Sequence, residues 1–163
     1  FQITSVMKSM TVSENIQLAT DKIRENSLNF FTTFTNKNYV LEKVDFCLGQ
    51  VGLIEANNQP VASLSHGDCR KLEIAMALAS DAKLLLLDEP MAGLGPSETQ
   101  EMISLLNKLK GKQTILLVEH DMDAVFALAD RISVLVSGEI IATGEPNNIR
   151  RDSKVQKAYL GEA

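Results

Sequence analysis

The sequence contains little cysteine and no long apolar run, and each scarcity excludes a class of protein. Cys47 and Cys69 are its two cysteines, and no CxxC or Cys/His cluster accompanies them, so they are too few for a zinc site. We expect both to be reduced thiols. No apolar run approaches the ~20 residues that span a bilayer, so direct membrane insertion is not expected. The segment Phe1 to Met10 also lacks the apolar core of a signal peptide.

Positive charge is scarce relative to negative charge. The 163 residues include 16 Lys and Arg against 21 Asp and Glu, a formal net charge of −5. An acidic chain is poorly suited to nucleic acid, because phosphate backbones are held by clustered basic side chains. Hydrophobic residues make up 45% of the chain, which is enough for one globular domain to bury a core without a disulfide or structural metal.

Helical signals dominate the first third of the chain. Residues 11–14 (Thr-Val-Ser-Glu) have capping-box spacing and precede apolar residues at helical intervals, which predicts a helix over 13–26. Residues 39–48 resume a helical spacing. The Asn-Asn-Gln-Pro cluster at 57–60 then breaks the pattern, so we expect a boundary between residues 55 and 63.

Beyond this boundary, helical patterns alternate with short apolar runs. Leu, Ile and Val runs between amphipathic helices are typical of a parallel sheet covered on both faces, so the fold class is α/β. We assign 1–62 to a helical subdomain, 63–143 to an α/β core and 144–163 to a helical tail. The predicted core helices span 67–80, 96–110 and 122–129, and the predicted strands span 83–87, 114–118, 132–136 and 140–143.

Two acidic residues follow a run of four leucines, at Leu84–Leu87 followed by Asp88 and Glu89. The carboxyl ends of strands are where open α/β sheets bind ligands. Asp88 can hold Mg²⁺, which needs only one or two protein oxygens, and Glu89 can take a proton from an attacking water. Taken alone, the pattern also fits a buried strand that ends in a solvated acidic turn.

The segment Leu64 to Asp68 (Leu-Ser-His-Gly-Asp) opens a predicted helix, with Ser65 and Asp68 at capping-box spacing. A helix start attracts anions, and Gly67 would let a phosphate approach the backbone. The alternative is an ordinary capped helix. Farther along, His120 follows a predicted strand and can hydrogen-bond a terminal phosphate, although a single surface histidine usually has no such role.

Taken in their order along the chain, these motifs resemble those of the ATP-binding cassette (ABC) ATPases. The segment 64–68 is similar to their signature motif, 84–89 to the Walker B strand, 92–95 to the D-loop, His120 to the switch histidine and Gln2 to the Q-loop glutamine. Within the family, the likeness is greatest to ATP-binding subunits of branched-chain amino-acid importers. That likeness lies in 1–2, 10–15, 90–96, 118–122 and 158–162.

The resemblance implies a mostly parallel P-loop NTPase sheet with flanking helices and a helical subdomain. It implies ATP and Mg²⁺ as cofactors, a second ATPase subunit, and transmembrane permease subunits that hold the protein at the cytoplasmic face of the membrane. Asp88 and Gln2 would serve the metal, Glu89 would polarise the attacking water, and His120 would contact the γ-phosphate. The further nucleotide-binding residues would be Ser65, Gly67 and Asp68, which would face the nucleotide of the opposite subunit.

The sequence also departs from the family pattern. His66 stands where the signature motif usually has a Gly-Gly pair, Asp68 and Cys69 stand near its usual Gln, and Gly95 replaces the usual Asp of the D-loop. The motif G-x-x-x-x-G-K-[ST] is absent from the 163 residues. We therefore expect the C-terminal part of a longer ATPase, inactive alone because the P-loop (Walker A) is missing, with an unpaired strand edge that favours self-association.

Two other functions are compatible with the motifs to different degrees. The chain could act as an interaction module that presents its signature motif in trans to a complete ATPase. DNA-repair ATPases share the signature motif, but the acidic charge and the small number of cysteines disfavour them, and no nucleic-acid partner is expected.

Overall fold

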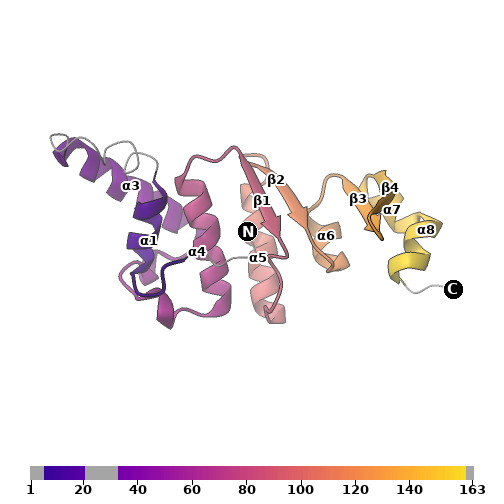
Figure 1. Ribbon diagram of the computed structural model, residues 1–163, viewed down its shortest axis with the longest axis horizontal. Coiled ribbons are helices and arrows are strands. Elements are labelled where there is room, and N and C mark those ends of the chain that lie inside the picture. The colour runs from indigo at the N-terminus through magenta and orange to yellow at the C-terminus, as the bar shows by residue number, and fades with distance from the viewer. Residues whose placement is uncertain (1–5, 21–32, 161–163) are drawn as a thin grey trace. The chain divides into compact units, whose positions relative to one another are not determined.

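The computed structural model describes residues 6–20 and 33–160 (Figure 1). The chain forms two compact units, Phe1–Val118 and Glu119–Ala163. The first unit contains α1 (Val12–Ala19), α3 (Thr33–Val51), α4 (His66–Ala79), β1 (Leu84–Asp88), α5 (Pro96–Leu109) and β2 (Thr114–Val118). The second contains α6 (Met122–Leu128), β3 (Ile132–Val136), β4 (Glu139–Gly144), α7 (Pro146–Arg151), α8 (Ser153–Val155) and a π-helical turn (Gln156–Leu160). The predicted division at residues 62 and 143 stays a prediction.

The capping box at the start of α1 is confirmed. The Glu14 amide donates to Thr11 Oγ1 at 3.3 Å, and the Thr11 amide donates to Glu14 Oε2 at 2.8 Å. The Thr11 amide, and then the Thr11 hydroxyl, which donates to the same Oε2 at 2.9 Å, favour the carboxylate and lower the pKa of Glu14. Helix α1 ends at Ala19, earlier than predicted, and residues 21–26 of the expected helix lie outside the described residues. Helix α3 begins at Thr33, earlier than the predicted start at Tyr39.

Helix α4 packs against α1 and α3 and closes the helical part of the first unit. Its Leu72 is fully buried, as are Ile16 of α1 and Leu48 of α3. Asn15 is also fully buried, and its side-chain nitrogen donates to the carbonyl oxygens of Met7 and Thr11 at 3.1 and 2.9 Å. A buried amide with these partners adds no uncompensated desolvation cost, so the polar residue is compatible with the core.

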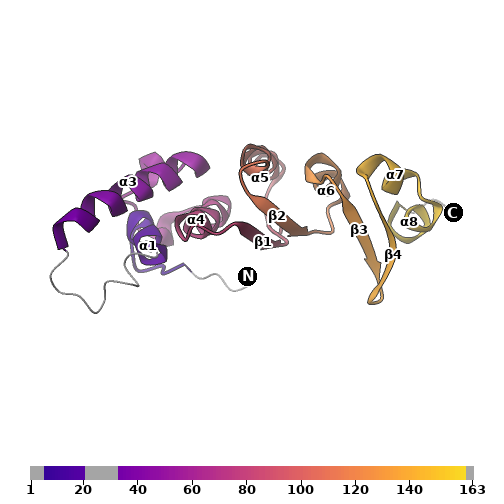
Figure 2. The ribbon, with the colours of Figure 1, turned by 90° about the horizontal axis from the view of Figure 1, so that it is seen from above.

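Strands β1 and β2 pair in parallel, with Leu86 opposite Leu116. Figure 2 shows α5 along one face of this pair, and Leu85 is 2% exposed. The expectation that helices cover both faces is wrong for the part of the chain that the structure describes. Side chains alternate between the two faces of a strand, and those on the second face are about half exposed. They are Leu84 at 49%, Leu86 at 55%, Leu116 at 58% and Val118 at 56%.

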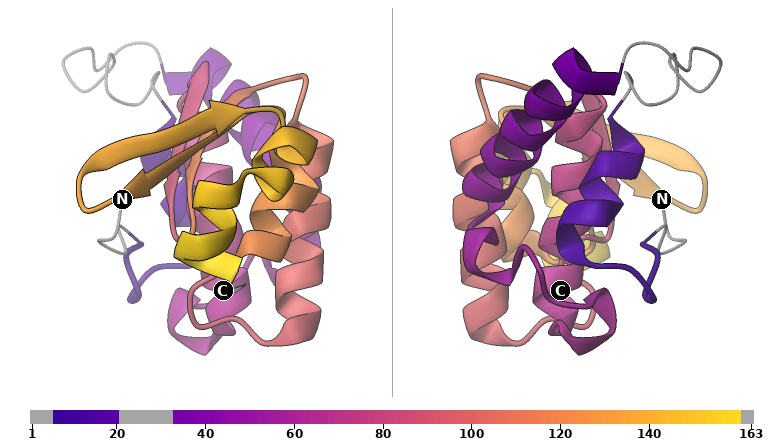
Figure 3. Two further views of the ribbon diagram at one scale, coloured as in Figure 1. Left: turned by 90° about the vertical axis from the view of Figure 1, so that its right-hand side faces the viewer. Right: turned by 90° about the vertical axis from the view of Figure 1, so that its left-hand side faces the viewer.

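The second unit is built on an antiparallel hairpin of β3 and β4 (Figure 3). Ser137 and Gly138 form its turn at φ of 50° and 86°, the left-handed conformation that tight hairpins require. Helices α7 and α8 contact β4, and the Tyr159 hydroxyl donates to the carbonyl oxygen of Leu135 at 2.7 Å. Four buried residues of this unit, Ile132, Val134, Ile149 and Val155, form one cluster.

Candidate functional site

The carboxyl end of β1 carries the predicted acidic pair, and both side chains are half-buried. Directly after β1, Glu89 adopts a φ of 46°, which non-glycine residues rarely do. Its amide donates to the carbonyl oxygen of Val118, the last residue of β2, at 2.8 Å. The Ala92 amide in turn donates to the carbonyl oxygen of Glu89 at 3.0 Å. The strained residue is therefore held from both sides, and such strain is concentrated at functional sites.

The start of α4 has the predicted cap. Ser65 is the N-cap, and its Oγ accepts a hydrogen bond from the Asp68 amide at 3.0 Å. The Asp68 carboxylate accepts from Lys71 Nζ at 3.2 Å, and Glu101 of α5 accepts from the same nitrogen at 2.8 Å. Asp68 thus places a partly neutralised negative charge in the first turn, where the family usually has an uncharged glutamine.

Gly67 lies against α5. A Cβ at this position would stand 2.7 Å from Glu98 Oε1, so a larger residue would require the Glu98 side chain to move. Glu98 Oε2 accepts from the Gly95 amide at 3.1 Å, which caps α5. In this structure the space above Gly67, where we expected a phosphate to approach, contains a side-chain carboxylate. Sequence reasoning missed Glu98, although its position three residues after Gly95 is a capping signal.

The loop that follows the acidic pair also reaches the start of α4. His66 Nε2 lies 3.3 Å from the carbonyl oxygen of Ala92. The predicted signature motif and the predicted D-loop are therefore in direct contact within one chain. Sequence reasoning noted His66 as a departure from the family and did not predict this contact.

The structure does not test the placement of the remaining two predicted site residues. His120 belongs to the second unit, and its amide donates to Glu119 Oε2 at 3.1 Å. Asp121 caps α6 through bonds from the amides of Asp123 and Ala124. Gln2 lies outside the described residues. The structure therefore brings together the acidic pair, the 92–95 loop and the start of α4, and it does not test the roles of His120 and Gln2.

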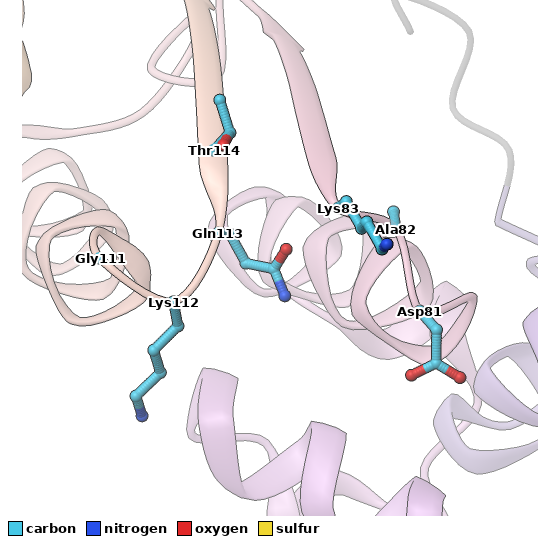
Figure 4. Close-up of a pocket in the computed structure, with 7 residues that line it drawn as sticks. All are labelled: Asp81, Ala82, Lys83, Gly111, Lys112, Gln113 and Thr114. Carbon is cyan, nitrogen blue, oxygen red and sulfur yellow. The ribbon is translucent and has the colours of Figure 1, made fainter.

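An open hollow of about 370 Å³ lies at the other end of the sheet (Figure 4). Asp81 to Lys83 line it just before β1, and Gly111 to Thr114 line it around the start of β2. In Figure 4 the Gln113 side chain extends between the two strand starts. None of the predicted site residues lines this hollow, so it adds nothing to the candidate site.

Among the described residues, Asp88 is the one that we expect to bind a metal ion. Within residues 6–20 and 33–160, no three His, Cys, Asp or Glu side chains gather as a metal-binding group. Mg²⁺ keeps most of its waters and needs only one or two carboxylates, so a half-buried aspartate at a strand end fits it. Nor does any helix in these residues combine the length and apolarity needed to cross a bilayer.

Comparisons with known proteins show the family to which this chain belongs. Residues 1–92 match the family described as ABC transporter, and residues 139–163 match the branched-chain amino acid ATP-binding cassette transporter family. The branched-chain amino acid transport ATP-binding protein LivG of Salmonella typhimurium is 38% identical over 170 residues, which cover 100% of this chain and 67% of LivG. BraF of Pseudomonas aeruginosa is also 38% identical, with the same coverage.

Solved structures give the same result. An ATP-binding cassette of an ABC transporter in its ADP conformation matches with a TM-score of 0.76 and 31% identity, over 95% of this chain and 64% of that one. A nucleotide-free cassette matches with a TM-score of 0.74 and 29% identity, over 99% and 67%. This chain therefore belongs to the ABC transporter ATPase domains, which confirms the predicted family and fold class. It spans about two thirds of the length of these relatives.

Proposed function

We propose that the chain is part of the ATP-hydrolysing subunit of an importer for branched-chain amino acids. The observation that carries this proposal is the contact of the loop after the Asp88–Glu89 pair with the start of α4, where His66 bonds to Ala92 and Ala92 bonds to Glu89. The family match and the names of the relatives LivG and BraF support it. Such a subunit would work as a dimer on permease subunits, at the cytoplasmic face of the membrane.

Each candidate residue has a distinct task in this proposal. Asp88 would hold Mg²⁺ through water, with Gln2 as the second metal contact and the link to the permease. Glu89 would orient and polarise the attacking water, and His120 would hydrogen-bond the γ-phosphate. Bound Mg²⁺ would neutralise charge on the phosphates. The residues that would face the nucleotide of the opposite subunit are Ser65, Gly67 and Asp68.

We further propose that the 163 residues need a P-loop from elsewhere to hydrolyse ATP. Phosphoryl transfer depends on positioning and charge stabilisation, which backbone amides and a lysine of the P-loop supply. No such motif occurs in the sequence. The exposed apolar face of β1 and β2 supports the same idea, because contiguous exposed apolar side chains mark surfaces that contact another segment or chain.

An interaction module is the second candidate function. It is favoured by the combination of a capped signature helix with no P-loop in the same chain. In this role the chain would present Ser65, Gly67 and Asp68 to the nucleotide of a complete ATPase, and Glu89 would have no catalytic task.

Mixing experiments separate the two functions. The N-terminal third of LivG, which carries the P-loop in this proposal, is combined with this chain, and phosphate release from ATP is measured. The enzyme function predicts activity in the mixture, none in either part, and loss of activity on Glu89→Gln. The module function predicts that the chain changes the rate of complete LivG and that Glu89→Gln has no effect. An inactive mixture with the N-terminal third, together with an unchanged rate of complete LivG, would contradict both functions.

A further inference from the structure

The side chain of His66 connects two parts of the candidate site that are distant in sequence. His66 is the first residue of α4, and its Nε2 lies 3.3 Å from the carbonyl oxygen of Ala92, in the loop after β1. A carbonyl oxygen only accepts hydrogen bonds, so Nε2 must carry the proton and donate. The signature motif that this segment resembles usually has glycine here, and glycine has no side chain that could make this bond.

The residue after Ala92 makes room for the imidazole. Gly93 has a φ of 76°, and a Cβ at this residue would stand 3.3 Å from His66 Nε2 and 3.4 Å from its Cδ2. The first separation is tighter than most Cβ contacts, and the backbone conformation is one that L-residues rarely adopt. Glycine at position 93 therefore permits both the turn and the approach of the ring.

Two further bonds extend this contact to Glu89. The Ala92 amide donates to the carbonyl oxygen of Glu89 at 3.0 Å, and the Glu89 amide donates to that of Val118 at 2.8 Å. Two hydrogen bonds thus hold Ala92: its carbonyl oxygen accepts from His66, and its amide donates to Glu89. Because Glu89 is held at a φ of 46°, any loosening of this turn would let it relax toward an unstrained conformation.

We propose that His66 is a positioning residue for Glu89, acting through the backbone of Ala92. The imidazole tethers the 89–92 turn to the start of α4 and thereby keeps the Glu89 carboxylate in a fixed direction. This inference rests on the proposed role of Glu89 in hydrolysis. The tether itself can be tested without any activity.

Amide hydrogen exchange of the full 163-residue chain, followed residue by residue by NMR, tests the tether. Three variants are compared with the unchanged chain: His66→Ala, His66→Gln and Asn107→Ala. The glutamine amide nitrogen can occupy the place of Nε2 and donate to the same carbonyl. Asn107 is an exposed residue of α5 and serves as the matched control.

We expect the amides of Ala92 and Glu89 to exchange about 2- to 10-fold faster in His66→Ala, the range that one hydrogen bond supports. His66→Gln should restore most of the protection, and Asn107→Ala should change neither amide. Unchanged exchange in His66→Ala would overturn the proposal. So would equal acceleration in the alanine and glutamine variants, because the effect would then not depend on the bond.

Kinetics of the chain mixed with the P-loop-bearing third of LivG provide the second readout. A misdirected Glu89 should lower kcat for ATP in His66→Ala and leave KM unchanged, and His66→Gln should recover kcat. A rise in KM with unchanged kcat would overturn the proposal. If the unchanged chain is also inactive in the mixture, the proposed function fails, and the hydrogen-exchange result alone decides whether His66 holds the turn.

Discussion

The amide of Glu89 donates a 2.8 Å hydrogen bond to the carbonyl oxygen of Val118, so the ends of β1 and β2 are joined one residue beyond the parallel pair. The bond is made with Glu89 at a φ of 46°, in the left-handed region. A side chain in this region costs roughly 1–2 kcal/mol, and glycine avoids most of that cost. The strain at the candidate catalytic residue is therefore measurable by substitution.

Alanine is usually the more stabilising of alanine and glycine, but at position 89 we expect the reverse. Glu89→Gly and Glu89→Ala both remove the carboxylate, but only alanine keeps a Cβ in the strained conformation. We expect the glycine variant to be more stable than the alanine variant by about 1 kcal/mol in urea unfolding. At Asn107, in the last turn of α5, the same two substitutions should give alanine the advantage, by up to about 1 kcal/mol. Greater stability of the alanine variant at position 89 would contradict the strained conformation.

The uncovered face of β1 and β2 should make the isolated chain self-associate. Apolar side chains that are half exposed on adjacent strands form a patch that another apolar surface can cover. Leu86→Lys should shift the mass measured by light scattering toward the monomer across a dilution series. Leu135→Lys is the matched control, because Leu135 in the second unit is 56% exposed and Leu86 is 55% exposed. A monodisperse monomer for the unchanged chain, or an equal effect of the two variants, would count against this prediction.

Lys71 should contribute to stability in a pH-dependent way. Burial opposes its charge, but its bonds to Glu101 and Asp68 outweigh burial and raise the pKa of Lys71. Its contribution is therefore complete below the ordinary value of 10.5 and is lost as the pH rises through the raised value. Lys71→Met should lower the free energy of unfolding by about 1 kcal/mol at neutral pH, and this loss should shrink at alkaline pH.

Lys108→Met is the control variant for that measurement. Lys108 is exposed on α5 and carries the same side chain as Lys71. Its replacement should change stability by less than about 0.5 kcal/mol at every pH tested. If the loss caused by Lys71→Met stays constant at alkaline pH, the ion pairs of Lys71 are not the source of its contribution.

Local patterns in the sequence were sufficient to predict most elements. The bounds of β2 and β3 were predicted as they are found, because each is a short apolar run between polar or glycine residues. The Ser65 cap was predicted because it needs only residues three positions apart. The family was predictable because its motifs keep a fixed order along the chain.

Features that depend on tertiary contacts could not be predicted in the same way. A run of four leucines indicates a strand buried on both faces, but the exposure of Leu86 depends on what covers the sheet. The contacts of His66 with Ala92 and of Gly67 with Glu98 join segments far apart in sequence, and no periodicity encodes them. Gln2 lies outside the described residues, so its predicted role stays a prediction.

The two cysteines should be reduced thiols of low and unequal reactivity. Cys47 is fully buried in α3, and burial raises the pKa of its thiol. Cys69 lies in the first turn of α4, where the helix start would ordinarily favour a thiolate. Burial, followed by the nearby Glu73 carboxylate, raises the pKa of Cys69 instead, so both groups should remain protonated at neutral pH.

Iodoacetamide labelling of Cys69→Ser and Cys47→Ala, followed by mass spectrometry, isolates each thiol. In Cys47→Ala, the half-buried Cys69 should label slowly at neutral pH and faster as the pH rises through and above the ordinary value of 9.0, because only the thiolate reacts. In Cys69→Ser, Cys47 should label only when urea unfolds the chain. Rapid labelling of Cys69 at neutral pH would show that the start of α4 stabilises negative charge more strongly than burial and Glu73 oppose it.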